Sequence, residues 1–357
     1  MTERTSLSRF SIRDLLILIT VAAVVLALLL PKILRARERA RKSMCAGRLS
    51  YITLAVHNFH STHKRMPQAM GATLLGISDR RSGVVELLPY LDQQELHQSI
   101  SQVLIIDGVR FAAGGSVPWD KSYLPWQVQL ATLRCPSDAS QEGTFASVNY
   151  VFSVGDLVTN LHSPVSKDNV RGAFAPGHAI RFREILDGLS NTIMMLETAT
   201  KRGHSIAGQF VVDVPIEKMQ APQDCFQFVD PARSDRYFKK TRLSDLGRGG
   251  NWADGAGGYS LGHTILPPNS SSVAIEGTAA VDGIFSASSR HLDGCHAAMC
   301  DGAVVFFSDS IESGDLGSEP PSAITDSDGN YIRSPYGLWG ILGTRASRET
   351  IEERLSH

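Results

Sequence analysis

The chain opens with an apolar block, and the rest of it consists of short apolar runs separated by polar and turn-forming residues. Thr20 is the only polar residue between positions 15 and 30. A bilayer core takes about 20 apolar residues as a helix, and apolar residues on both sides of the block extend it to this length. The block has no polar stripe, which a helix lying on the membrane surface would need. The pattern therefore predicts a membrane-spanning helix at about residues 12–34.

The helical pattern continues beyond the apolar block. Residues 33–51 are rich in Arg, Ala, Leu and Glu, which favour helix, and the segment that follows carries apolar side chains at a loose helical spacing. We expect one helix from about Phe10 to about Thr62, with a kink at Pro31. No small-residue cleavage site of the secretory type follows the apolar run, so we expect the segment to be retained.

From Pro67 onward, frequent Gly, Pro, Ser and Asn separate the apolar runs. The runs predict a helical segment broken at Pro89, a short helix followed by a strand, two further strands, and a hairpin. The hairpin turns at Asp301-Gly302, a pair suited to a type I′ turn. These elements are expected at residues 84–100, 182–199, 148–156, 208–215 and 296–311. Because strands and helices do not alternate regularly, the pattern favours an α+β fold with a mostly antiparallel sheet.

The end of the chain has a different composition, rich in Ser, Asp, Glu and Pro. We expect it to cross the surface before a short helix at residues 347–355. The chain is thus divided into an N-terminal helix (residues 1–65), an α+β body (66–311) and a C-terminal extension (312–357).

The net charge of −1 hides an uneven distribution. Residues 1–48 contain ten Lys or Arg and three Asp or Glu, a net charge of +7, which leaves −8 for the remainder. The acidic body offers no basic face to phosphates, so we expect no nucleic-acid partner. The basic cluster next to the apolar block suits anionic lipid headgroups.

The five cysteines form no CxxC pair, which argues against a zinc ribbon or a thioredoxin-type motif. One or two disulfides are expected if the body lies outside the cytoplasm, and their pairing stays open. The cysteines are Cys45, Cys135, Cys225, Cys295 and Cys300.

Residues 9–67 resemble the N-terminus of prepilin-like proteins with a type IV-type cleavage and methylation motif, which are related to the pseudopilins of type II secretion. In these proteins an aromatic residue starts the mature helix and a proline kinks it; Phe10 and Pro31 have the matching spacing. The resemblance implies a glycine before the aromatic and a glutamate that pairs with a neighbouring subunit, but here these positions are Arg9 and Asp14. We therefore favour an uncleaved, pilin-derived anchor over a processed subunit.

More narrowly, the chain is similar to a large bacterial family of such proteins whose C-terminal domain has no known function. Family motifs stand at CPSD (135–138), NY (149–150), DGLSNT to Glu197 (187–197), WADG (252–255), PPN (267–269), SRH (289–291), DG (301–302) and GLWGILGTR (337–345). The family's H-x-G-G segment begins at His291 and ends at Gly294, and Asp293 replaces its first glycine, which puts a tight loop there in question. Asp301 and Gly302 close the same hairpin. The resemblance implies a pilin-like fold, a long helix packed on an antiparallel sheet.

Two groups of residues are candidate metal ligands. His57, His60 and His63 recur every three residues, but no fourth ligand accompanies them, so a solvated helix end is favoured over a metal site. Residues 326–330, DSDGN, pack oxygen ligands around a glycine as calcium loops do, yet lack the later glutamate of an EF-hand. Calcium therefore stays open against an ordinary acidic turn, with Asp326, Asp328 and Asn330 as its candidate ligands.

Catalytic motifs are weak. Residues 288–296 bring Ser, His and Asp close in sequence, but no G-x-S-x-G segment is present. Residues 247–251, GRGGN, lack the ending of a phosphate loop and suggest a flexible turn. Asp187, Glu197 and Asp254 could form an acid/base set, although the sequence does not bring them together. We expect no catalysis and no cofactor other than the open case of calcium.

These observations predict a single-pass protein of the cytoplasmic (inner) membrane with a periplasmic or cell-surface body. The count of basic residues on the two sides of the apolar block favours the opposite orientation, and we follow the resemblance. The expected function is structural or interactive, with the lipid bilayer and other pilin-like subunits, or secretion or pilus machinery, as partners. The alternative is a membrane-tethered metal-dependent or hydrolytic enzyme.

Overall fold

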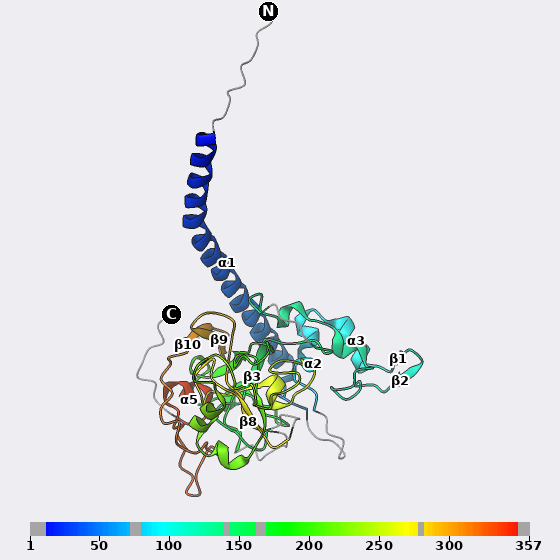
Figure 1. Cartoon of the computed structure of the whole chain (residues 1–357). Coiled ribbons are helices and arrows are strands. Elements are labelled where there is room, and N and C mark those ends of the chain that lie inside the picture. The colour runs from blue at the N-terminus through cyan, green and yellow to red at the C-terminus, as the bar shows by residue number, and fades with distance from the viewer. Residues whose placement is uncertain (1–11, 72–79, 139–142, 162–168, 278–281, 349–357) are drawn as a thin grey trace, which may run out of the picture.

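The computed structural model describes residues 12–71, 80–138, 143–161, 169–277 and 282–348. Its dominant element is helix α1 (Ile12–His63), 52 residues long, which continues through Pro31. Figure 1 shows α1 projecting from the body, with its axis bending on the way down. The prediction of one long N-terminal helix is confirmed.

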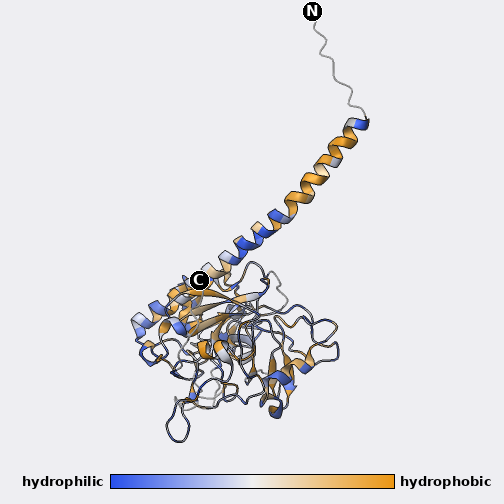
Figure 2. Ribbon diagram, turned by 90° about the vertical axis from the view of Figure 1, so that its left-hand side faces the viewer, coloured by the Kyte–Doolittle hydropathy of each residue, from blue (hydrophilic) through white to orange (hydrophobic). Residues whose placement is uncertain are grey.

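Helix α1 has two parts with different surroundings. The first part, from Ile12 to about Leu34, projects away from the body and is called the rod below. Its apolar side chains are exposed, and the helix is long and apolar enough to cross a membrane. Figure 2 shows this part as a continuous apolar rod followed by a hydrophilic stretch. The second part packs into the body and buries Cys45, Leu49, Ile52, Val56 and Phe59. These positions are three and four residues apart, so they lie on one face of the helix.

The main sheet of the body has five strands in the order β10-β9-β4-β3-β6. Its pairs are antiparallel apart from β3 with β6. The strands are β3 (Tyr150–Ser153), β4 (Ile193–Glu197), β6 (Leu261–Gly262), β9 (Gly294–Met299) and β10 (Val304–Ser308). Helix α1 contacts β9 and β10. The α+β fold with a long helix against a mostly antiparallel sheet is confirmed.

Smaller elements complete the body. A second sheet has the order β5-β7-β8, and β1 pairs with β2 in a separate hairpin. The remaining elements are α2 (Val84–Leu87), η1 (Leu88–Leu91), α3 (Gln94–Ser101), β1 (Leu104–Ile106), β2 (Val109–Phe111), η2 (Leu124–Gln127), η3 (Ala131–Leu133), η5 (Phe182–Glu184), η6 (Leu189–Asn191), β5 (Val211–Val214), η7 (Ile216–Met219), η8 (Pro222–Phe228), α4 (Gly257–Ser260), β7 (Val273–Ile275), β8 (Gly283–Ile284) and α5 (Gly337–Gly343). The predicted break at Pro89 is the passage from α2 through η1 to α3.

The predicted hairpin between β9 and β10 is confirmed, but its turn type is wrong. A type I′ turn needs positive φ at both central residues, and here only Gly302 has it, at 100°. The amide of Gly302 donates to the carbonyl of Met299, and the amide of Met299 donates to the carbonyl of Ala303. The loop is therefore a three-residue connection in which glycine takes the left-handed position.

Two expectations for loop segments need correction. The GRGGN segment is a turn as expected, but it is buried rather than flexible, and the guanidinium of Arg248 donates to the carbonyls of Gly257, Gly258 and Leu261. The C-terminal region does not simply cross the surface, because Trp339 in α5 is fully buried and its indole N–H donates to the carbonyl of Leu266. The helix expected at residues 347–355 lies mostly outside the described residues.

Candidate functional site

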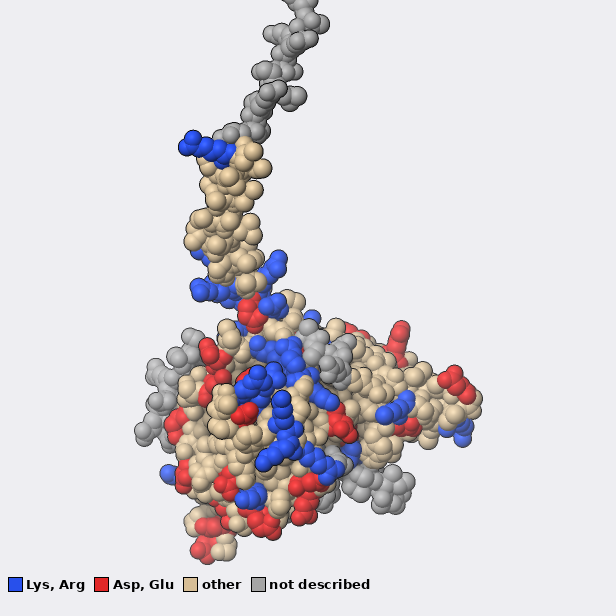
Figure 3. All heavy atoms as spheres, viewed as in Figure 1, with Lys and Arg blue, Asp and Glu red and all other residues tan. Residues whose placement is uncertain are grey.

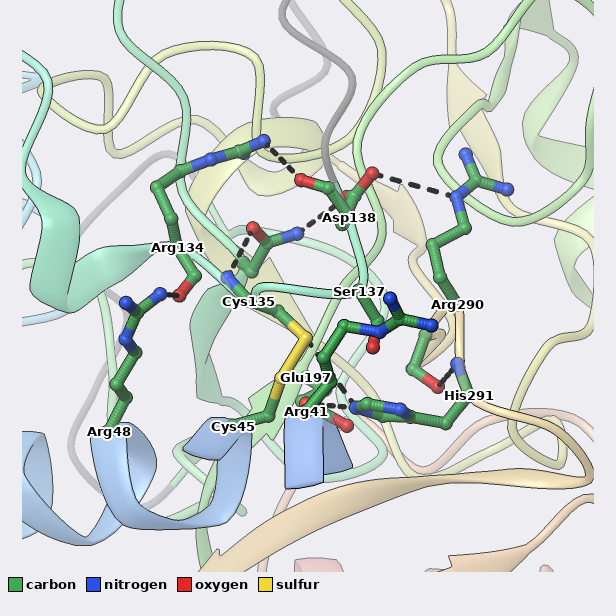
Figure 4. Close-up of a disulfide and its surroundings, with 12 residues drawn as sticks. Arg41, Cys45, Arg48, Arg134, Cys135, Ser137, Asp138, Glu197, Arg290 and His291 are labelled. Atoms are coloured by element: carbon green, nitrogen blue, oxygen red, sulfur yellow. Dashed lines mark hydrogen bonds and ion pairs between the residues drawn. A yellow bond between two sulfur atoms is a disulfide. The ribbon is translucent and has the colours of Figure 1, made fainter. Parts of the chain in front are cut away.

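The candidate site is the junction between α1 and the body, where a disulfide joins Cys45 of α1 to Cys135. Figure 4 shows this bond surrounded by charged and polar side chains from several segments of the body. The two cysteines are 90 residues apart in sequence, and both are buried. Cys225, Cys295 and Cys300 are buried thiols.

The CPSD and NY segments form one side of the junction. The backbone N–H of Cys135 donates to Asn149 Oδ1 at 2.9 Å, and Asn149 Nδ2 donates to Asp138 Oδ2 at 2.7 Å. The hydroxyl of Tyr150 donates to the carbonyl of Cys45 at 3.1 Å. All of these groups are buried, where unpaired polar atoms would cost several kcal/mol. The motif residues therefore hold the disulfide loop and the turn of α1 in one arrangement.

A row of alternating carboxylates and imidazoles forms the other side; Glu197, His291 and His296 are buried, and Glu38 is 29% exposed at its end. His291 Nδ1 lies 2.9 Å from Glu38 Oε1 on α1, and His291 Nε2 lies 3.5 Å from Glu197 Oε1 on β4. Glu197 Oε2 accepts from the backbone N–H of His296 at 2.6 Å and lies 3.0 Å from its Nδ1. The Glu38 carboxylate also accepts from the Ser137 hydroxyl at 3.1 Å. His291 thus links α1 to the centre of the main sheet.

Burial and the neighbouring charges shift the pKa values of this row in opposite directions. Burial alone would lower the pKa of His291, but hydrogen bonds and charges from Glu197 and Glu38 outweigh it and raise the pKa above 6.5. Burial would raise the pKa of Glu197 and of Glu38, but hydrogen bonds from the two histidines to Glu197 and from His291 and Arg41 to Glu38 lower both below 4.5. The row therefore favours the protonated form of His291 and the ionised forms of the carboxylates on either side of it.

Lys42 of α1 contacts β10 of the body next to this row. Its ammonium lies 3.0 Å from the centre of the Phe306 ring, a cation–π contact. The ring of Phe306 in turn packs edge-on against His296, with centroids 5.1 Å apart. This contact joins α1 to the hairpin of β9 and β10.

The H-x-G-G segment keeps its loop in spite of Asp293. That residue has φ of 64°, in the left-handed region where glycine is favoured, so the aspartate takes a backbone conformation that suits a glycine. Gly294 packs tightly against β10, where a Cβ would lie 2.0 Å from the carbonyl oxygen of Phe307. His291 and Gly294 thus belong to the junction, whereas Asp301 and Gly302 form the hairpin loop, near His57 of α1.

The other predicted positions lie elsewhere. Asp326 accepts hydrogen bonds from the backbone N–H groups of Asp328 and Asn330 in an exposed turn. Arg9 and Phe10 lie outside the described residues, and Asp14 is part of α1.

The three helix histidines contact aromatic rings. His57 and His60 stack on Phe182, and His63 contacts Tyr90. The expectation of a simply solvated helix end was therefore incomplete.

The three acidic residues considered as a catalytic set have separate partners. Asp254 pairs with Arg80 at 2.6 Å, Asp187 accepts from the backbone of Ser347 at 2.9 Å, and Glu197 belongs to the row of carboxylates and imidazoles. Glu38 and His296 were missed as members of the site. Glu38 sits among basic residues of an exposed-looking helix, and His296 lies within a strand pattern; neither has a local sequence signal.

The fold and the site define the class: a protein with one N-terminal helix apolar enough to cross a membrane, tied covalently to an α+β body. A family described as protein of unknown function, DUF1559, matches residues 35–314. This is more than half of the 357 residues, and the chain belongs to this family. No curated protein and no solved structure matches the chain. The matched range begins after the apolar block of α1, and the relation to prepilins stays a prediction.

Proposed function

We propose that the protein is a membrane-anchored, pilin-like structural or interaction protein whose body lies outside the cytoplasm and which performs no catalysis. The division of α1 is the observation that carries this proposal. The first part is an exposed apolar rod, and the second is buried in the body. An apolar rod of this kind is unfavourable in water and needs lipid, or the helices of other subunits, around it.

The junction makes the connection between anchor and body rigid. One continuous helix passes from the rod into the body, and the disulfide, the His291 row and Lys42 hold its second part in place. A tether that only retained a protein at the membrane would not need this rigidity, because a flexible linker would suffice. A rigid stalk suits a subunit whose body must take a fixed position relative to the bilayer or to neighbouring subunits.

The disulfide supports an orientation with the body outside the cytoplasm. Disulfides form and persist in oxidising compartments and are rare in the cytosol. The exposed basic residues lie at the foot of the rod, where Figure 3 shows them gathered next to the body. They are placed to meet anionic headgroups at the membrane surface.

Burial supports the absence of catalysis. The side chains of His291 and Glu197 are each 1% exposed, so a substrate in solution has no direct access to them. A set of buried, mutually paired charges is typical of a structural network.

A fusion experiment tests the anchor and its orientation. Alkaline phosphatase, which is active only where its own disulfides form, would be fused after the last residue of the full chain. We expect activity in intact cells and recovery of the fusion in the membrane fraction after alkaline carbonate washing. Activity confined to a cytoplasmically active β-galactosidase fusion would contradict the proposed orientation.

N-terminal sequencing of the protein from its native membrane separates an anchor from a processed subunit. Because Arg9 stands where the glycine of the prepilin-like motif is expected, we expect a start at or near Met1. A start at Phe10 would favour processing and assembly with pilin-like subunits.

The enzyme alternative has its own test. The full-length protein in detergent would be tested with a panel of ester, phosphoester and peptide substrates, with and without divalent metals. We expect no turnover above that of the His291→Gln variant. Turnover that disappears in this variant would replace the structural function by a hydrolytic one.

A further inference from the structure

We infer that Cys45, Cys135, Glu197 and His291 form a zinc-binding site when the disulfide between the two cysteines is reduced. This inference concerns the junction itself and does not depend on the proposed function. The ligand atoms of these four residues all lie within 4.8 Å of one another, and all four residues are buried. They come from α1, the CPSD loop, β4 and the segment before β9.

The donor set has the chemistry that zinc prefers. Two thiolates, one imidazole nitrogen and one carboxylate oxygen give four protein ligands, as in closed, tetrahedral structural sites. Zinc–sulfur bonds of about 2.3 Å at a tetrahedral angle place two sulfur atoms about 3.8 Å apart. The 4.8 Å span of the group can contain this arrangement once the sulfur–sulfur bond is broken. Calcium and magnesium prefer sets made of oxygen atoms and fit it poorly.

An atom of Glu197 is available to the metal. Its Oε1 is buried, and among the described residues its one charged neighbour at ion-pair distance is His291 Nε2, 3.5 Å away, with no short hydrogen bond to it. Its other oxygen is occupied by the backbone and the ring of His296. The carboxylate is thus fixed by one oxygen and presents the other to the two sulfur atoms and to His291.

The hydrogen bond to Glu38 also orients the imidazole of His291. Glu38 Oε1 lies 2.9 Å from His291 Nδ1, so Nδ1 carries the proton and Nε2 points toward Cys135 Sγ, 3.5 Å away. A carboxylate behind a histidine in this way fixes the tautomer and strengthens a metal–nitrogen bond. The site therefore has both its direct ligands and the partners that hold them.

Reduction of the disulfide and binding of zinc are two steps in which electrons and protons balance. A dithiol reductant transfers two electrons and two protons to the Cys45–Cys135 bond, which becomes two thiols while the dithiol becomes a disulfide. Zn²⁺ then replaces both thiol protons, which pass to solvent, and binds the unprotonated Nε2 of the neutral His291 imidazole; an imidazolium would release its Nε2 proton to solvent as well. The result is two Zn–S bonds, one Zn–N bond and one Zn–O bond, which join α1 to the body in place of the covalent S–S bond.

Zinc binding by the full-length chain in detergent tests the inference. The protein would be reduced with a phosphine and dialysed against Zn²⁺, with metal content and the charge-transfer absorption of a Co²⁺ substitute as readouts. We expect one zinc per chain in the reduced protein and at least 100-fold weaker binding in the disulfide form. Equal binding by the two forms, or no binding by the reduced and folded protein, would overturn the inference.

Three variants make the test specific. Cys135→Ser should weaken binding by at least 100-fold, and Glu38→Gln, which leaves the disulfide and all four ligands in place, by about 10- to 100-fold. Cys225→Ser removes a buried thiol outside the site and should bind as the unmodified chain does. Binding that is unaffected by Glu38→Gln and by Cys135→Ser would show that zinc binds elsewhere.

Circular dichroism of the reduced chain covers the case in which reduction unfolds the protein. A chain that loses its native signal without metal and regains it with one equivalent of Zn²⁺ supports the site, because metal binding is then coupled to folding. A reduced chain that stays unfolded with Zn²⁺ contradicts it.

Discussion

At the residue scale, Asp293 shows how a residue other than glycine can hold a left-handed backbone position at a cost in stability. The loop before β9 needs a residue with positive φ, and Asp293 takes it at 64°. Left-handed backbone costs a non-glycine residue about 1 kcal/mol, and somewhat less for aspartate, which tolerates this region. The loop is therefore kept by the surrounding contacts rather than by the residue itself.

Replacing Asp293 by glycine should stabilise the protein. We expect Asp293→Gly to raise the free energy of unfolding by no more than about 0.5 kcal/mol, because relief of the left-handed strain is partly offset by the greater entropy that glycine gives the unfolded chain. Urea denaturation in detergent measures the change. Asp301→Gly is the matched control: Asp301 lacks positive φ and its carboxylate accepts from the amide of Ala303, so this variant should be destabilised. A loss of stability in Asp293→Gly would contradict the argument.

The row of His291, Glu38 and Glu197 predicts a pH dependence of the disulfide-bonded protein. The pKa of His291 is raised above 6.5, so its contribution to stability is complete below pH 6.5 and is lost as the pH rises through its folded-state pKa. The pKa values of Glu38 and Glu197 are lowered below 4.5, so their contribution is complete above pH 4.5 and is lost as the pH falls through their folded-state values. The free energy of unfolding should be greatest between pH 4.5 and 6.5.

Urea denaturation across pH 3 to 9 measures this profile. The variant His291→Gln should lose the decline on the alkaline side and should be less stable at pH 6 by about 3 kcal/mol, because it leaves buried carboxylates without their positive partner. A wild-type profile that rises steadily from pH 6 to 9 would show that His291 is not protonated in the folded protein.

How far the sequence predicts the structure also differs by residue. The motif residues from CPSD to SRH could be identified in the chain, and the structure brings several of them together around one disulfide. The pairing of Cys45 with Cys135 and the contact of Glu38 with His291 could not be derived, because they join residues far apart in sequence whose positions depend on the whole fold. His296 looked like an ordinary strand residue for the same reason.

At the element scale, α1 was the most predictable part because one pattern determines it. Its apolar block and its helix-forming extension are local signals. The body determines which face of the second part is buried. The sequence nevertheless indicates one apolar face, because its apolar residues recur every three to four positions, at Cys45, Leu49, Ile52, Val56 and Phe59. The buried α5 lacked such a local sign, since its apolar residues stand among glycines in a segment rich in polar residues.

A pair of leucines tests how α1 is docked. Leu49 is 0% exposed and Leu54 is 53% exposed on the same part of the helix. We expect Leu49→Ala to lower the free energy of unfolding by about 3 kcal/mol, through lost burial and the cavity left behind. Leu54→Ala should change it by less than about 0.5 kcal/mol. Urea denaturation compares the two variants, and similar effects would contradict the packing of α1 described here.

At the scale of the whole molecule, a long helix projects from a body that lies at its C-terminal end (Figure 1). The exposed rod, the basic residues at its foot and the body, whose surface carries both acidic and basic residues, follow one another along the molecule, as Figures 2 and 3 show. This order matches the layers of a bilayer, its anionic headgroups and the aqueous space beyond. If the rod lies in lipid, the body needs no membrane contact of its own. Membrane localisation then depends on the rod.

Charges placed in the rod should therefore release the whole protein from the membrane. Val25 lies within the apolar block, and an arginine near the centre of a membrane helix costs about 3 kcal/mol. The double variant Leu18→Arg/Val25→Arg adds two such charges to the rod, so we expect most of the chain to be extracted by alkaline carbonate, whereas the unmodified chain stays in the pellet. Leu54→Arg, at an exposed position of the same helix outside the block, serves as the control and should stay in the pellet. If the double variant also stayed, the body or a partner would hold the protein at the membrane, and the rod would have to be explained by packing against other helices.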